Sequence, residues 1–272
     1  MPEGPEIRRA ADHLARAVAG QVLRDVWFAF PALAAQADRL VGRRVVAIEP
    51  HGKALLTHFE GGLSLYTHNQ LYGVWKVAVP GRWPQTSRSL RVALSTAKKS
   101  ILLYSASEIE LWPTERLPDH PFLAKLGPDV LDPRLDADAV LARLELPRFR
   151  GRSLTALLLD QAFLAGMGNY LRSEVLFEAG LAPQRRPREL NGAERRALAS
   201  ALLAVPRRSY ATRGVSRRAR SRLRGDLQVD HGDAFRFRVF DRAGEPCEAC
   251  GGTVQREELG GRRLYWCSRC QA

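Results

Sequence analysis

The chain has 272 residues, which permits one large domain or two domains of ordinary size and is ample for a sizeable core. Its 42 basic and 29 acidic residues leave a net charge of +13, and this excess favours a polyanionic partner such as nucleic acid or an anionic membrane. No apolar run approaches the length of a membrane span, and the polar, charged N-terminus is unlike a signal peptide, so we expect a cytosolic protein.

The first six residues, Met-Pro-Glu-Gly-Pro-Glu, contain a candidate nucleophile. The small residue at position two favours removal of Met1, which would leave Pro2 with a secondary α-amine. A free α-amine has a pKa of roughly 7.7–8.0, so a useful fraction is neutral near pH 7 and can form a Schiff base or iminium ion. Glu3 stands beside it as a carboxyl group able to move protons. Taken alone, the same residues also fit an ordinary N-terminus with Pro5 opening a helix.

A helical pattern follows, and short strands come after it. Apolar residues recur at steps of three or four from Ile7 to Val18, and Gly20 suits a stop, so this helix would anchor residues 2 and 3. A series of short segments separated by turn formers then predicts a β-sandwich or barrel. These segments are Val22–Phe28, Arg44–Ile48, Ala54–Phe59, Leu63–Tyr66, Gly73–Val79, Leu90–Leu94, Ile101–Tyr104 and Glu108–Trp112.

Two candidate sites interrupt the strands. Lys53 follows Gly52 in a predicted turn that leads into an apolar strand, where it is either functional or a solvated turn lysine. The loop containing Gln70, Leu71 and Tyr72 mixes amide, aliphatic and aromatic groups without a charge. An exposed apolar loop tip on a DNA-binding protein can act as a wedge between bases, and the alternative is a buried hairpin corner.

Prolines become frequent from Pro113 to Pro133, which predicts a linker between domains, and Lys125 lies within it. Four helices are predicted beyond the linker, with Asn191 and Glu194 as a capping pair for the last. They are Asp136–Leu146, Ser153–Leu164, Tyr170–Ala179 and Gly192–Leu203.

The turn Gly166-Met167-Gly168 precedes the third helix, and Asn169 is a good N-cap residue. A helix N-terminus behind a glycine turn can bind phosphate, although a plain helix–helix turn explains the same residues. The segment from Arg207 to Arg224 is rich in arginine, has no carboxylate and predicts a mobile loop. This loop either follows a DNA backbone or is a solvated run of charge.

Two C-x-x-C pairs near the C-terminus predict a tetrahedral zinc site with four thiolates. The segments Thr253–Gln255 and Arg263–Trp266 between the pairs suggest two strands of a zinc ribbon, joined by a turn that ends in Arg262. One structural Zn²⁺ is expected, because no ligand position looks open. Arg262 could contact a phosphate, or it could be a solvated turn arginine. The four ligands are Cys247, Cys250, Cys267 and Cys270.

Five motifs in this order resemble the formamidopyrimidine-DNA glycosylase/endonuclease VIII family, over essentially the whole chain, and favour its endonuclease VIII side. The motifs are residues 1–7, 52–56, 68–73 and 166–171 and the terminal cysteine pairs. The resemblance implies an α+β multidomain fold, with an N-terminal β-sandwich and flanking helices, a helix-two-turn-helix domain and a C-terminal β-hairpin zinc ribbon. The expected domains are 1–125, 126–233 and 234–272.

The resemblance also implies catalytic roles. The protein would be a monomer that acts on double-stranded DNA containing damaged bases or abasic sites, in the bacterial cytoplasm at the nucleoid. Pro2 would attack C1′ of the damaged nucleotide, and Glu3 would act as general acid and base. Lys53 would bind a nearby phosphate and assist β-elimination. Arg262 would bind phosphate and support δ-elimination.

DNA-binding roles follow from the same resemblance. Asn169 would bind a flanking phosphate, while Gln70, Leu71 and Tyr72 would fill the gap left by the flipped base. Lys125 stands where relatives are expected to have an arginine, which keeps the charge but loses the bidentate fork.

The resulting prediction is a bifunctional DNA glycosylase and AP lyase of base excision repair that acts on oxidised pyrimidines. One alternative is the same chemistry on oxidised purines, but purine-directed relatives usually begin Pro-Glu-Leu-Pro-Glu, whereas this chain has Gly4. The other alternative is a non-catalytic zinc DNA-binding protein, which would be expected to lack Pro2, Glu3 or Lys53.

Overall fold

The computed structural model describes residues 2–215 and 237–272. Contacts divide them into two compact units. The first unit contains Pro2 and residues 6–124, and the second contains residues 3–5, 125–215 and 237–272. Helix α1 (Gly4–Val18) thus begins in the second unit and continues in the first. Among the described residues, no helix combines the length and hydrophobicity that a bilayer span needs.

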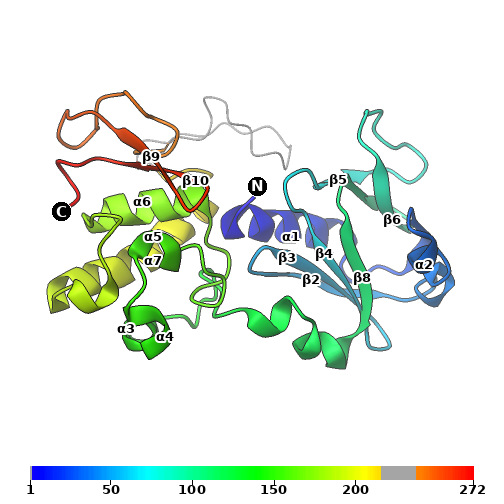
Figure 1. The fold of residues 1–272 in the computed structure, drawn as a ribbon. Helices are drawn as coiled ribbons and strands as arrows, with labels where there is room; N and C mark the ends of the chain where they lie inside the picture. Colours follow the sequence, from blue (N-terminus) through cyan, green and yellow to red (C-terminus); the bar gives the residue numbers. More distant parts are fainter. Residues whose placement is uncertain (1, 216–236) are drawn as a thin grey trace. The chain divides into compact units, whose positions relative to one another are not determined.

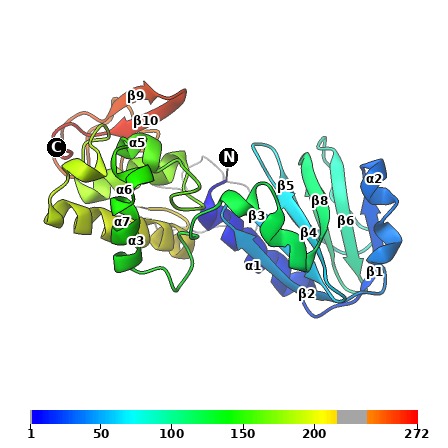
Figure 2. The same cartoon turned by 60° about the horizontal axis from the view of Figure 1, so that its bottom comes forward.

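The first unit is built on two four-stranded antiparallel sheets (Figures 1 and 2). One sheet has the order β1-β6-β7-β5, and the other has the order β2-β3-β4-β8. The strands of the first sheet are β1 (Leu23–Phe28), β5 (Val74–Ala78), β6 (Leu90–Thr96) and β7 (Ser100–Tyr104). Those of the second are β2 (Val45–His51), β3 (Ala54–Phe59), β4 (Leu63–His68) and β8 (Glu108–Pro113).

Both sheets contribute to one hydrophobic core, which confirms the predicted β-sandwich. Phe28 and Leu94 come from the first sheet, Leu55 and Leu65 from the second, and Leu14 from α1. The apolar residues of α1 recur at helical spacing and are buried on one side of that helix. Each predicted strand segment overlaps an observed strand, because short β-branched and apolar runs between glycine turns encode strands locally.

Short helices connect the strands and form the predicted linker. They are α2 (Pro31–Ala34), η1 (Ala37–Arg39), η2 (Thr114–Asp119) and η3 (Leu123–Lys125). The proline-rich segment therefore starts as the end of β8 and continues as two 3₁₀ turns, with Lys125 exposed at the end of the second.

The second unit is mainly helical. Its helices are α3 (Ala137–Glu145), α4 (Pro147–Arg150), α5 (Leu154–Leu157), α6 (Asn169–Ala179), η4 (Pro187–Glu189) and α7 (Gly192–Thr212). Helices α6 and α7 pack around a core that includes Leu171, Val175, Leu198 and Leu202. This arrangement confirms the helical region predicted after the linker.

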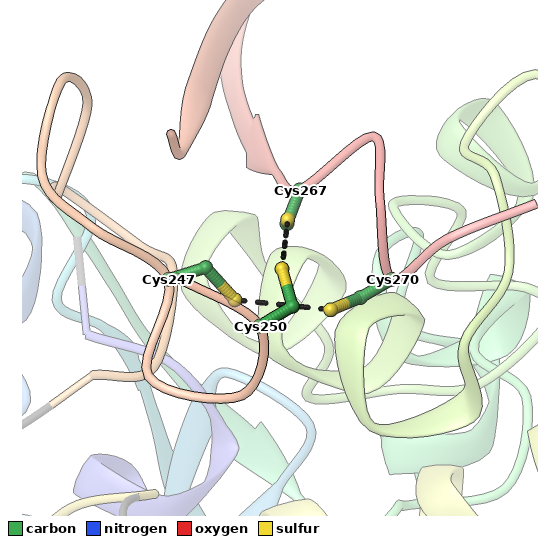
Figure 3. A group of neighbouring side chains, drawn as sticks. All are labelled: Cys247, Cys250, Cys267 and Cys270. Carbon is green, nitrogen blue, oxygen red and sulfur yellow. Dashed lines mark hydrogen bonds between the residues drawn. The ribbon is translucent and has the colours of Figure 1, made fainter. Parts of the chain in front are cut away.

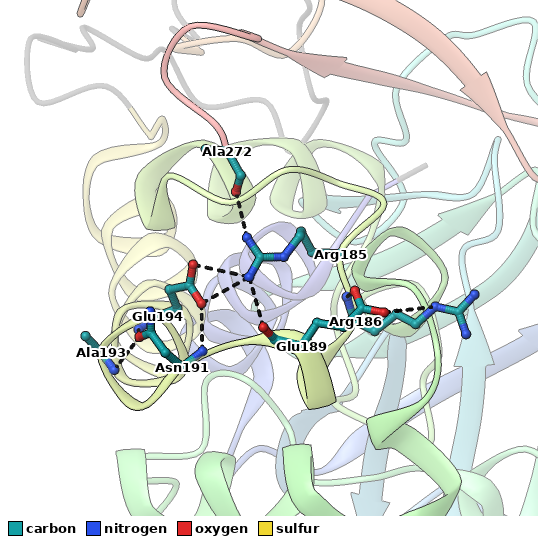
Figure 4. A network of polar contacts seen from close by, with 7 residues as sticks. All are labelled: Arg185, Arg186, Glu189, Asn191, Ala193, Glu194 and Ala272. Carbon is teal, nitrogen blue, oxygen red and sulfur yellow. Dashed lines mark hydrogen bonds and ion pairs between the residues drawn. The ribbon is translucent and has the colours of Figure 1, made fainter.

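The predicted capping pair at the start of α7 is present (Figure 4). The Asn191 side chain accepts hydrogen bonds from the backbone N–H groups of Ala193 and Glu194, and the Glu194 carboxylate accepts one from the Asn191 N–H. Arg185 extends this network, because its guanidinium pairs with Glu194 at 3.1 Å and donates to the carbonyl of Ala272 at 3.3 Å. The C-terminal residue is thereby connected to the start of α7.

The predicted helix over Ser153–Leu164 is wrong, because only Leu154–Leu157 forms a helix. Asp160 ends the helical path by accepting a hydrogen bond from Ala162 N, a local competition with the helix backbone that aspartate favours. The break places Gln161 beside the glycine turn, where its amide accepts from Gly166 N and donates to the Met167 carbonyl.

The predicted end of the last helix at Leu203 is also wrong, because α7 continues through Pro206 to Thr212. Val205, Pro206 and Ser209 are buried, so burial offsets the backbone hydrogen bond that proline removes. Residues 207–212 of the predicted arginine-rich loop are therefore helical. Residues 216–224 of that prediction lie outside the described residues.

The zinc ribbon is a β-hairpin of β9 (Gln255–Leu259) and β10 (Arg262–Trp266). The hairpin was predicted, but its first strand was placed too early. Gly260 and Gly261 both have positive φ and form the two-residue turn by themselves, so Leu259 pairs with Arg262. Arg262 is therefore the first residue of β10, exposed beside the turn.

Candidate active site

The Glu3 carboxylate lies at the N-terminus of α6, within the second unit. Its two oxygens accept hydrogen bonds from the backbone N–H groups of Tyr170 at 2.8 Å and Leu171 at 3.1 Å. These N–H groups belong to the first turn of α6 and have no partner within the helix, and the helix dipole favours an anion there. Glu3 is only 4% exposed. The carboxylate thus caps a helix that is distant in sequence and is fixed in position by it.

Glycines make this close approach possible. A Cβ atom at Gly168 would lie 2.3 Å from the Glu3 Cδ atom, so no larger residue fits without moving the carboxylate. Gly4 donates its backbone N–H to the Gly166 carbonyl at 2.8 Å, and a Cβ at Gly4 would lie 3.2 Å from the Gly166 Cα. Glu3 and Gly4 of the N-terminal motif and the glycine turn, recognised separately in the sequence, therefore form one site within the second unit.

Asn169 is not the N-cap of α6, contrary to prediction, because Gly168 occupies that position. The Asn169 side chain instead donates to the carbonyl of Arg263 at 2.7 Å and accepts from the Arg172 guanidinium at 2.6 Å. Since Glu3 already satisfies two N–H groups of the first turn, the Asn169 side chain can connect α6 to β10.

Arg172 was not identified from the sequence. Its side chain is fully buried, and its Nη2 atom donates both to Asn169 and to the Arg263 carbonyl at 3.0 Å. The Nε and Nη1 atoms are buried and have no hydrogen-bond partner among the described residues. The segment Tyr-Leu-Arg-Ser-Glu-Val-Leu mixes apolar and polar residues and gave no signal, because nothing in it marks the arginine as buried.

The electrostatics around Arg172 favour an anion. Burial, and to a lesser degree the positive charge of Arg262, lower the pKa of its guanidinium to about 10, although Glu3 acts in the opposite direction. The group therefore stays charged at neutral pH while it is near a second arginine. Two cations and two unsatisfied buried donors close to a helix N-terminus are the features expected of a phosphate-binding site.

A buried carboxylate fixes the segment that enters the zinc ribbon. Glu174 on α6 accepts hydrogen bonds from the backbone N–H groups of residues 238–240 at 2.9–3.1 Å. Glu178, one helical turn further on, pairs with Arg208 at 3.1 Å and with Arg238 at 2.7 Å. Neither carboxylate was predicted from the sequence, because their partners are distant in sequence.

The four cysteines form the predicted metal site (Figure 3). Their sulfur atoms all lie within 4.8 Å of one another, with Cys247 and Cys270 at 3.8 Å and Cys250 and Cys267 at 3.5 Å. A tetrahedral Zn²⁺ with bonds of about 2.3 Å requires sulfur–sulfur distances of about 3.8 Å, so the donor set fits zinc. Four protein ligands complete the coordination, which makes the zinc structural.

The first unit contains Pro2 and Lys53. Pro2 is half-buried, two residues before the start of α1. Lys53 lies in the predicted turn between β2 and β3 but is only 8% exposed, so it is not a solvated turn lysine. The next residue, Ala54, pairs with His68 across β3 and β4. Burial lowers the pKa of His68, Glu108 opposes this, and the Lys53 charge adds to the lowering. Lys53 therefore lies beside the base of the loop that follows β4.

That loop has the exposed tip expected of a wedge. Leu71 and Tyr72 are 56% and 66% exposed and are among the few large apolar side chains of the described chain that face solvent. The alternative of a buried hairpin corner is therefore wrong.

The comparisons with known proteins agree with this arrangement. Residues 1–107 match the formamidopyrimidine-DNA glycosylase N-terminal domain, residues 126–220 its H2TH domain, and residues 244–272 the zinc finger found in FPG and IleRS. Endonuclease 8 of Escherichia coli O6:K15:H31 is 56% identical over 275 residues, and that of Salmonella enteritidis PT4 is 56% identical over 271 residues. Each alignment covers 100% of both chains.

Solved structures have the same fold. Lactococcus lactis Fpg in complex with DNA containing N7-benzyl-Fapy-dG has a TM-score of 0.82 and 20% sequence identity, with 99% of each chain covered. The same values hold for Lactococcus lactis Fpg bound to DNA with an abasic site. The chain therefore belongs to the formamidopyrimidine-DNA glycosylase/endonuclease VIII family and resembles endonuclease 8 along its whole length.

Proposed function

We propose that this protein is a bifunctional DNA glycosylase and AP lyase of base excision repair that removes oxidised pyrimidines. The observation that carries the proposal is the 56% identity with endonuclease 8 over the full chain, combined with a Glu3 carboxylate fixed beside a candidate phosphate site. The partner is double-stranded DNA with damaged bases or abasic sites, in agreement with the net charge of +13.

Base removal begins at Pro2. Its amine nitrogen attacks C1′ of a nucleotide that has left the base stack, the glycosidic bond breaks, and the base departs with a proton. Opening of the sugar ring gives an iminium ion between Pro2 and C1′. Glu3 is the group we assign to the proton transfers, because it follows Pro2 directly and its orientation is fixed by α6.

Strand cleavage follows from the iminium ion, which acidifies the C2′ hydrogen. Loss of that proton breaks the C3′–O bond in β-elimination, and a second elimination breaks the C5′–O bond. We assign Lys53 to a phosphate beside the lesion and to assistance of the first elimination, and Arg262 to a phosphate and to the second. Both are cations next to backbone turns, and Arg262 is exposed.

DNA binding uses further residues of both units. We assign Asn169, together with Arg172, to a flanking phosphate, and the loop of Gln70, Leu71 and Tyr72 to the wedge that fills the gap left by the flipped base. Lys125 is exposed at the end of η3, where a cation can contact the DNA backbone. The zinc ribbon contributes Arg262 and is fixed to α6 by Glu174.

The same proposal includes action as a monomer and domain limits of 1–125, 126–233 and 234–272. The proposed compartment of the protein is the bacterial cytoplasm at the nucleoid, where its double-stranded DNA substrate is found.

Borohydride trapping tests the function. The protein is incubated with duplexes carrying one oxidised pyrimidine or one 8-oxoguanine, and the covalent enzyme–DNA adduct is measured over time. Faster trapping on the pyrimidine duplex is expected. Faster trapping on the 8-oxoguanine duplex would assign the protein to oxidised purines. Binding without trapping on either duplex would leave only a DNA-binding role.

A further inference from the structure

The three candidate wedge residues in the loop between β4 and β5 differ in exposure and in hydrogen bonding. The Gly73 N–H donates to the Asn69 carbonyl at 2.7 Å and closes the loop into a tight turn. Leu71 and Tyr72 extend from this turn into solvent. Gln70 is instead bound to the rest of the first unit through both its side chain and its backbone.

The Gln70 side-chain amide is satisfied at both ends. Its Nε2 atom donates to the Glu108 carboxylate at 2.5 Å, and its Oε1 atom accepts from the Ser107 hydroxyl at 2.7 Å. Its backbone has a positive φ of 50°, a left-handed conformation that is unfavourable for a non-glycine residue. Such a conformation persists only where surrounding contacts hold it.

His68 supplies one of these contacts. Its Nδ1 atom accepts the Gln70 backbone N–H at 3.1 Å, which requires that nitrogen to be unprotonated. Burial lowers the pKa of His68 despite the nearby Glu108, so the acceptor form is present at neutral pH. His68 pairs with Glu108 across β4 and β8, so both supports of Gln70 come from adjacent strands of a rigid sheet.

A second support lies on the other side of the tip. Arg88, in the segment before β6, donates from its Nη1 atom to the Tyr72 carbonyl at 2.8 Å. The backbone is therefore held on both sides of Leu71, while the apolar side chains of Leu71 and Tyr72 stay exposed.

We propose that Glu108 and Ser107 are positioning residues that hold Gln70 as the anchor of the wedge, with His68 and Arg88 fixing the loop backbone. This inference rests on the proposed function, because a wedge acts only on DNA from which a base has been extruded. A loop that is already ordered loses less conformational freedom when it enters the base stack. Loss of the Gln70 anchor should therefore slow insertion of Leu71 and Tyr72 into the base stack more than it weakens the initial binding of DNA.

The test measures insertion without chemistry. Enzyme in excess is mixed in a stopped-flow instrument with a duplex that carries a tetrahydrofuran abasic analogue opposite 2-aminopurine, and the fluorescence change is followed. At saturating enzyme the rate reports insertion, whereas the concentration dependence reports binding. Glu108→Ala should slow the saturated rate by on the order of tenfold, as expected for loss of one hydrogen bond to a charged group. Ser107→Ala should slow it by about twofold to threefold.

Glu110→Ala is the matched control. Glu110 lies on the same strand, two residues from Glu108, and the two side chains are 47% and 48% exposed. The control removes the same charge but leaves Gln70 untouched, because the Glu110 carboxylate binds the Trp112 indole and lies 3.5 Å from the His120 ring nitrogen. Its saturated rate should equal that of the wild type.

Two results would overturn the inference alone: wild-type rates in both Glu108→Ala and Ser107→Ala, or equal slowing in Glu110→Ala, which would indicate a charge effect. The wild type is tested first in the borohydride assay on an oxidised-pyrimidine duplex. A wild type that neither forms the adduct nor changes 2-aminopurine fluorescence would overturn both the proposed function and this inference.

Discussion

Gly168→Ala tests whether the α6 N-terminus positions Glu3. The new Cβ atom would lie 2.3 Å from the Glu3 Cδ atom and 2.4 Å from its Oε1 atom, whereas carbon atoms in contact are about 3.5–4.0 Å apart. The carboxylate must therefore move by more than about 1 Å, which breaks its hydrogen bonds to Tyr170 and Leu171. Each hydrogen bond to a charged group contributes about 1.5–3 kcal/mol, and water recovers part of this, so we expect a loss of about 3 kcal/mol in stability.

The catalytic loss should be larger than the loss of stability suggests. A displacement of about 1 Å can lower a rate by about a hundredfold, and Glu3 is assigned to base removal. The assay compares base release from an oxidised-pyrimidine duplex with cleavage at a preformed abasic site, below the melting temperature of the variant. Base release should fall on the order of a hundredfold, and more than cleavage does.

Gly192→Ala is the control for this prediction, because Gly192 is the first residue of α7 and an added Cβ would approach only the Arg196 side chain, at 3.5 Å. Wild-type stability and base release in Gly168→Ala would refute the assigned position of Glu3.

Three further predictions concern the second unit. Metal analysis should find one zinc per chain, and Cys250→Ala should lower both zinc content and DNA affinity; undiminished activity of metal-free protein would contradict a structural zinc. Arg262→Ala should keep the fold and zinc but weaken binding of damaged DNA, and it should reduce the slope of log affinity against log salt concentration by on the order of one unit. An unchanged slope would indicate that Arg262 is a solvated turn arginine. Arg172→Met should weaken binding of abasic duplex by roughly tenfold, measured by anisotropy, because it removes a buried cation and its bond to Asn169; equal affinity would exclude a phosphate site there.

Features encoded by neighbouring residues were predictable from the sequence. The cysteine pairs, the capping pair of Asn191 and Glu194 and the short strands depend on spacing over a few residues, and the structure contains all of them. Helix ends were less predictable, since α7 continues through Pro206 where tertiary burial offsets the cost of proline, and Asp160 ends a run whose composition is typical of a helix.

Contacts between distant segments could not be predicted from one sequence. The prediction of Asn169 as an N-cap was wrong, because the Glu3 carboxylate, more than 160 residues earlier in the sequence, binds the first turn of α6 instead. Arg172 is charged, and helix periodicity alone gives no reason to bury it among apolar residues. The support of Gln70 by Glu108 likewise depends on the pairing of β4 with β8.

The most direct test of the central claim identifies the residue that bonds to DNA. The enzyme is trapped with borohydride on an oxidised-pyrimidine duplex, the DNA is digested, and the protein is mapped by tandem mass spectrometry. Our account predicts the sugar remnant on the nitrogen of Pro2 in a chain that has lost Met1, and no adduct when an uncleaved extension precedes Pro2. A remnant on Lys53 or another lysine, or equal trapping of the extended protein, would contradict it.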